Sequence, residues 1–327
     1  MSTKKRRAKR IVYKQAQFKS KHLTLQQLLD KARSKKAKAV DRIELLDEES
    51  VLRRFINSFV AQDGMIFGQM LFYEAGKDQT VVVLDDTTSE YPVESLPIPK
   101  RRDGKGQEVL ESVLYFGVLD NHVVLAQSQA LRARDFENHL YWLFRRCTQT
   151  LEEDQVLTLS DQPSQKARDK IEKSPVKKVV LGTSLESQQE EVEETTEVDH
   201  AKKIKFRPVG KAFDVISAVL GDNWRKDVKL DEALDDANLQ VNLEITYVRK
   251  TTITAHKLLD NIATSMRHAE PEDVKVLTDS GAVIKGNEIK LGANLHVNTF
   301  NGIVDSTDMY REMHQWLEDR IKDGSVQ

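Results

Sequence analysis

The clearest pattern of hydrophobic and polar positions lies in the middle of the chain. Apolar residues fill both faces of an extended segment at Val113–Leu119, and His122–Ala126 follows after the turn residues Asp120–Asn121. This arrangement predicts a hairpin that is buried on both faces. Asp135–Cys147 then predicts a helix, capped by its first residue, whose apolar positions recur at helical spacing: Phe136, Leu140, Leu143, Phe144 and Cys147. Hairpin and helix together predict a core-forming unit.

The same pattern extends toward the N-terminus. It predicts strands at Ile11–Phe18, Arg42–Leu46, Met65–Glu74 and Gln79–Leu84. It predicts helices after the capping residue Thr24 and over Glu49–Val60. The continuous apolar run Val81–Leu84 indicates a position near the centre of a sheet.

A second set of elements follows residue 147. Strands are expected at 155–159, 177–181, 239–249, 274–277, 282–285 and 288–297, and helices at 212–220, 254–268 and 306–322. The predicted fold is α+β, with two mixed α/β domains whose sheets are antiparallel or mixed and which are joined by a charged linker region. The expected boundaries are a basic arm and first strand at 1–20, an N-terminal domain at 11–147 and a C-terminal domain at 148–327. The acidic segment 185–201 is expected to be disordered, because it has almost nothing apolar to bury.

The distribution of charge along the chain says more about the function than the overall composition does. The formal net charge is only −2, yet the first forty residues are rich in Lys and Arg and contain one acidic residue, Asp30. Such asymmetry points to an anionic partner, most often nucleic acid. The basic residues nearest the N-terminus form an arm that is expected to be flexible: Lys4, Lys5, Arg6, Arg7, Lys9 and Arg10.

Further basic groups are spread along the chain. They are Lys100, Arg101, Arg102, Arg145, Arg146, Arg225, Lys226, Arg249 and Lys250. Taken singly, each is typical of a solvated surface; taken together they favour double-stranded DNA, which they would hold through its phosphates without reading the sequence. No segment matches a helix-turn-helix, a zinc finger or an RNA-recognition sheet.

Two other functions compete with DNA binding. Asp279, Glu288 and Lys290 have the order of an acid followed by Glu-x-Lys, the arrangement of metal-dependent nucleases, although any polar strand edge produces this motif by chance. The acidic segment Glu186–Glu197 could instead make the protein an adaptor that binds another protein.

Most other kinds of chemistry find no support in the sequence. The histidines lack metal-ligand spacing, and the single cysteine, Cys147, excludes a cysteine-based zinc site and a disulfide framework within one chain. We therefore expect no cofactor and no catalytic residue. No apolar stretch approaches the roughly 18 residues of a membrane helix, so a cytoplasmic protein without direct membrane insertion is expected.

The order of the elements resembles a known family, the A component of the phage lambda Rex exclusion system (RexA-like proteins). The likeness is strongest at Pro208–Gly221, with the sequence PVGKAFDVISAVLG. It extends over Tyr13–Leu29, Tyr115–Phe144, Val176–Gly182, Leu239–Met266, Asp273–Val297 and the last helix. The basic arm and the acidic segment depart from the family pattern.

The resemblance implies a function as well as a fold. It implies a two-domain, homodimeric DNA-binding protein that helps to exclude infecting phage, an antiviral defence of the abortive-infection type. A membrane protein of the same defence system would be its partner. In role, the chain is also similar to the DNA-binding component of the Kiwa defence system.

Overall fold

The computed structural model describes residues 4–18, 23–47, 49, 51–84, 90–99, 103, 105–152, 155–162, 173–174, 176–184, 186–196, 199–209, 240–246, 274–278, 280–286 and 290–326. The chain divides into two compact units. The first joins Met1–Ser164 to Lys290–Gln327, and the second is Gln165–Ile289. This division differs from the expected boundary after residue 147, because the end of the chain returns to the first unit.

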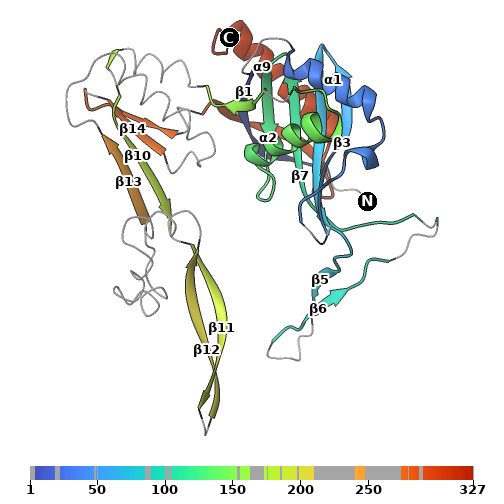
Figure 1. Cartoon of the computed structure of the whole chain (residues 1–327), viewed down its shortest axis with the longest axis vertical. Coiled ribbons are helices and arrows are strands. Elements are labelled where there is room, and N and C mark those ends of the chain that lie inside the picture. Colours follow the sequence, from blue (N-terminus) through green and yellow to red (C-terminus); the bar gives the residue numbers. More distant parts are fainter. Residues whose placement is uncertain are drawn as a thin grey trace. The chain divides into compact units, whose positions relative to one another are not determined.

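An antiparallel sheet forms the centre of the first unit (Figure 1). Its strands follow the order β17-β16-β1-β8-β7-β4-β3-β2, and β9 also pairs with β1. Their bounds are β1 Lys4–Phe18, β2 Glu44–Leu45, β3 Leu52–Gln62, β4 Met65–Glu74, β7 Leu110–Leu119, β8 His122–Ala126, β9 Leu157–Ser160, β16 Gly292–Phe300 and β17 Ile303–Val304. The fold is therefore α+β with antiparallel sheets, as the sequence pattern predicted.

Helices cover both faces of this sheet. α1 (Leu25–Lys35) and α2 (Ala133–Trp142) bury their apolar faces in one core, and α9 (Ser306–Lys322) buries its own in another. Side chains alternate along β1, so Ala16 contributes to the first core while Ile11 and Tyr13 contribute to the second. A sheet with apolar residues on both faces requires cover on both sides, and the helices provide it.

The central hairpin and its helix are confirmed. β7 and β8 are joined at Asp120, whose φ of 51° provides the tight reversal. The helix begins at Ala133, and Asp135 caps it from within the first turn, where its Oδ2 accepts the Arg132 backbone N–H at 2.8 Å. A π-helical turn, η2 (Leu143–Cys147), continues the helix. Cys147 is only half buried there, and its thiol donates to the carbonyl of Asp41.

The helix expected over Glu49–Val60 is a strand, β3, paired on its two edges with β2 and β4. The register of the β3–β4 pair shifts between Ile56 and Ser58. This irregularity breaks the two-residue alternation of apolar positions and leaves spacings of three and four, which also suit a helix. The sequence pattern was misleading at this point.

The apolar run Val81–Leu84 is also not at a sheet centre. It begins in β5 (Gln79–Val82), which pairs only with β6 (Val93–Leu96) in a two-stranded sheet. The side chain of Val82 is 54% exposed and that of Leu84 is 77% exposed. The run therefore packs against no core.

The second unit contains a four-stranded antiparallel sheet in the order β13-β10-β14-β15. The bounds are β10 Val176–Ser184, β13 Gln240–Thr246, β14 Val274–Thr278 and β15 Val283–Lys285. The helices expected at 212–220 and 254–268 lie outside the described residues. In the part of the chain that is described, no helix combines the length and apolar character needed to cross a membrane.

The acidic segment is not disordered but forms a hairpin. β11 (Glu186–Thr196) pairs with β12 (Asp199–Val209) along its whole length. The register places Glu190 opposite Lys205 and Glu193 opposite Lys202. Opposite charges at facing positions favour a strand pair, and neither segment shows this complementarity when it is considered alone.

Candidate nucleic-acid interface

The basic residues nearest the N-terminus lie on a regular strand. Residues 4–10, expected as a flexible arm, are the first half of β1 and pair with β16 from Lys4 opposite Phe300 to Arg10 opposite Asn294. All of these residues are exposed. The pairing fixes the direction in which each cation points, which a flexible arm would not do.

Three of these cations form a row. Lys5, Arg7 and Lys9 alternate along β1, so their side chains leave the strand on the same side at intervals of about 6.8 Å. Their facing residues on β16 are uncharged: Thr299, Val297 and Leu295. No ion pair joins them to any other residue that the structure describes. We call Lys5, Arg7 and Lys9 the basic row.

Two other cations of the strand have partners. The ammonium of Lys4 lies 6.0 Å from the centre of the Phe300 ring. The guanidinium of Arg6 donates to the carbonyl of His296 at 3.2 Å and lies 3.8 Å from Glu312. Arg6 thus has an acidic partner, and the Lys4 ammonium lies over an aromatic ring, whereas the basic row has no ion-pair partner among the described residues.

Arg145 and Arg146 mark a second basic surface, at the end of η2. The ammonium of Lys35 on α1 donates to the carbonyl of Thr148 at 3.0 Å, which brings the basic end of α1 beside this turn. An open depression of about 580 Å³ lies there, lined by Asp30, Lys31, Ser34, Lys35, Gln149 and Thr150. The guanidinium of Arg145 stacks 5.7 Å from the centre of the Tyr141 ring and donates to the carbonyl of Glu152. Arg146 is exposed.

The remaining predicted contacts lie outside the described residues. They are Lys100, Arg101, Arg102, Arg225, Lys226, Arg249 and Lys250. The structure therefore positions the strand residues and the Arg145–Arg146 pair, and a role for the other residues stays a prediction.

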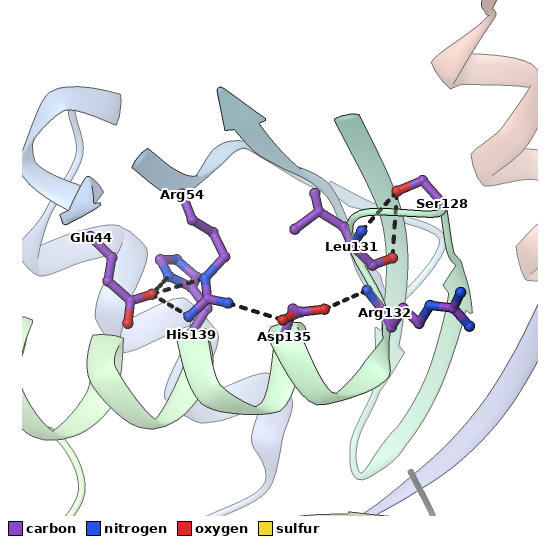
Figure 2. Close-up of polar contacts among 7 residues, drawn as sticks. All are labelled: Glu44, Arg54, Ser128, Leu131, Arg132, Asp135 and His139. Carbon is purple, nitrogen blue, oxygen red and sulfur yellow. Dashed lines mark hydrogen bonds and ion pairs between the residues drawn. The ribbon is translucent and has the colours of Figure 1, made fainter. Parts of the chain in front are cut away.

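A buried polar network holds the helix that leads to Arg145 and Arg146 (Figure 2). One oxygen of Glu44 accepts from Arg54 at 3.0 and 2.9 Å and lies 2.8 Å from Nδ1 of His139. Arg54 also reaches Asp135 at 3.5 Å. The network joins β2 and β3 to two successive turns of α2, so it fixes the position of the helix.

Burial sets the protonation states in this network. Burial lowers the pKa of His139, although Glu44 opposes the shift, and the imidazole is therefore neutral with its proton on Nδ1. Burial alone would raise the pKa of Glu44, but hydrogen bonds from His139 and Arg54 outweigh it and bring that pKa below its ordinary value. His139 is completely buried, whereas the Asp135 side chain at the other end of the network is 34% exposed.

Sequence patterns did not single out this network. Glu44 and Arg54 are unremarkable in the sequence, since one falls in a short predicted strand and the other in a predicted helix that is in fact β3. The spacing of Asp135 and His139, four residues apart on a helix, was the available signal.

The nuclease motif is only partly described. Asp279 and Glu288 lie outside the described residues, whereas the side chain of Lys290 is 9% exposed and its ammonium lies 3.7 Å from Asp161. Asp161 also accepts from Lys14 at 2.6 Å. Lys290 thus belongs to a buried ion cluster within the first unit. The described residues contain no group of acidic, histidine and cysteine side chains arranged to hold a metal ion.

Comparisons with known proteins identify no relative of this chain. No family model matches it, and no curated protein or solved structure does so either. The resemblance to RexA-like proteins and the functions it implies therefore stay predictions.

Proposed function

We propose that this protein is a sequence-tolerant, non-enzymatic protein that binds double-stranded DNA. The observation that carries the proposal is the basic row: Lys5, Arg7 and Lys9 point the same way from a paired strand and have uncharged neighbours across it. Ordering these cations before binding reduces the entropy that DNA binding must overcome.

The chemistry of the row suits a phosphate backbone. Duplex DNA carries one phosphate charge per roughly 3.4 Å of each strand, and cations about 6.8 Å apart can each neutralise a separate phosphate. Lysine and arginine contacts of this kind supply affinity through counterion release but carry no base information. Arg145 and Arg146 would extend the contact, as would the predicted basic residues outside the described ranges.

The biological setting rests on the resemblance to RexA-like proteins. On that basis we place the protein in the cytoplasm, as a homodimer that takes part in phage exclusion. A membrane protein of the same defence system would be its partner. The charge pattern independently supports DNA binding, and it carries no information about phage.

A charge-reversal experiment tests DNA binding. In the triple variant Lys5→Glu, Arg7→Glu, Lys9→Glu, affinity for a random-sequence duplex should fall by roughly 100-fold at low salt. The slope of log K against log salt should lose roughly two to three units, since each phosphate contact contributes about 0.9. Fluorescence anisotropy across a salt series measures both quantities.

The matched control changes the same amount of charge elsewhere. Arg134, Lys275 and Lys322 are exposed cations on α2, β14 and α9, and their reversal to Glu should leave the salt slope nearly unchanged. Equal losses in the two variants would mean that only net charge matters and that β1 is no interface. The duplex should stay intact during incubation with Mg²⁺, and its cleavage would favour the nuclease alternative.

A further inference from the structure

β1 has an open edge beside its basic residues. One edge of the strand pairs with β16 from Lys4 onward, but the pairing of the other edge with β8 begins only at Ile11, opposite Ala126. β8 ends at Ala126, where the chain leaves the sheet toward α2. No described strand covers the β8-side edge over Lys4–Lys9. Within the described residues, this stretch of the edge has no partner strand.

The direction of the backbone groups follows from hydrogen bonds farther along β1. The Tyr13 N–H donates to Leu291 on the β16 side, and the Ala16 N–H donates to Asn121 on the β8 side. The carbonyl of Lys5 faces β16, where it accepts from the Thr299 hydroxyl. Peptide groups alternate in a strand, so odd-numbered residues face β16 and even-numbered residues face the open edge. The free edge thus presents the N–H and C=O groups of Lys4, Arg6 and Ala8.

Charge restricts which strand could pair there. Positive side chains flank the edge, so a basic strand would be repelled and a neutral strand would gain nothing from charge. The chain itself contains the complementary arrangement, since acidic β11 pairs with basic β12 and Glu190 and Glu193 stand opposite lysines. An acidic strand would gain both backbone hydrogen bonds and charge pairing.

We propose that the Lys4–Lys9 edge of β1 binds an extended acidic polypeptide segment, which joins the sheet as an added strand. The partner is recognised by its backbone and by its glutamates or aspartates. If the protein also binds DNA as proposed above, the added strand places carboxylates against the basic row and so competes with DNA. The docking site itself does not depend on that function.

The test uses the full-length protein and a labelled nine-residue peptide in which glutamates alternate with valines. Anisotropy without DNA should show saturable binding. The Ala8→Pro variant should weaken this binding by roughly tenfold or more, because proline removes a donor from the open edge and its ring blocks a close strand. The β16 ladder does not use the Ala8 N–H, so the fold should survive. Ala8→Ser keeps the donor and should bind the peptide normally.

A change in the peptide provides a second test that leaves the protein unaltered. Replacing two central valines by proline preserves the charge but prevents strand pairing, and this peptide should not compete for the site. Equal binding of the two peptides would overturn the proposal, and so would an Ala8→Pro protein that binds as well as the wild type. Either result would reduce the contact to charge attraction.

DNA binding is measured separately on the same proteins. Ala8→Pro should bind duplex DNA within about twofold of the wild type, because phosphate contacts need side chains and not the strand edge. Peptide binding without DNA binding would leave the docking site intact and remove the proposed function. DNA binding without peptide binding would leave the proposed function intact and remove the docking site.

Discussion

Two groups of positively charged side chains among the described residues have opposite environments. Arg54 and Arg42 are buried and held in place: Arg54 pairs with Glu44, and the Arg42 guanidinium donates to main-chain carbonyls that include those of Ile56 and Asn57. Lys5, Arg7 and Lys9 are exposed and have no such partners among the described residues. The first group stabilises the fold, and the second is available to a ligand.

Glu44→Gln should lower the free energy of unfolding of the protein and leave its exposed basic residues unchanged. The substitution removes the carboxylate that compensates buried Arg54 and that accepts from His139. Breaking a buried pair from one side costs about 3–5 kcal/mol, and Asp135 at 3.5 Å offsets part of this loss. Chemical denaturation should show a decrease of about 2–4 kcal/mol in the free energy of unfolding. Glu312→Gln, at an exposed ion pair, serves as the control and should change this free energy by less than about 1 kcal/mol.

Acid should destabilise the same region. Burial lowers the pKa of His139 below 6.5, so the unfolded chain takes up a proton before the folded one, and stability falls as the pH drops below about 6.5. The pKa of Glu44 is also lowered, so its contribution is complete above pH 4.5 and is lost as the pH falls through the folded value. Unfolding free energies should therefore rise from pH 4 to about pH 6.5 and stay level from there to pH 8 as far as these two groups are concerned. His139→Gln should flatten the part of the curve near pH 6, and an unchanged curve would contradict this assignment.

At the scale of elements, local patterns were reliable and distant pairings were not. The β7–β8 hairpin, α1 with its Thr24 cap and α9 were predictable, because each depends on neighbouring residues. The pairing of β1 with β16 was not, since its two strands lie at opposite ends of the sequence. The basic arm was consequently expected to be flexible, and the basic row could not be recognised.

The other errors at this scale have separate causes. The irregular register at Ile56 gives β3 a spacing of apolar residues that suits a helix. The acidic strand β11 has a single apolar residue, Val192, so its own sequence gives no apolar alternation, and its pairing with the more basic β12 shows only in the register of the two strands. The candidate site was predictable in part. The density of positive charge identified its residues, but the pairing of β1 in the sheet is what makes the side chains of the basic row point the same way.

At the scale of the whole molecule, the first unit is discontinuous in sequence. Its second core combines Tyr13 and Phe67 with Val297, Met309 and Trp316, so residues after 290 complete a structure begun near the N-terminus. The Tyr310 ring stacks 5.1 Å from that of Phe67. Neither segment can bury the side chains that it contributes to this second core without the other segment.

A deletion should reveal this dependence. A chain in which residue 164 is joined to residue 290 by a short Gly/Ser linker should fold with one cooperative thermal transition. Residues 1–164 alone should aggregate or remain unfolded, because Ile11, Tyr13 and Phe67 lose their cover. Circular dichroism melting compares the two proteins. A cooperative transition in residues 1–164 alone would show that α9 and β16 are dispensable for folding of the rest of the first unit.

The pairing of Lys4 with Phe300 has a consequence for synthesis on the ribosome. At about 5–20 residues per second, β1 waits roughly 15–60 s for the strand that will cover one of its edges. During that interval both edges of its first half are open in every nascent chain. Mutual repulsion among the cations of neighbouring nascent chains then keeps these strands from joining one another, so the charge that suits a ligand in the finished protein also protects the unfinished one.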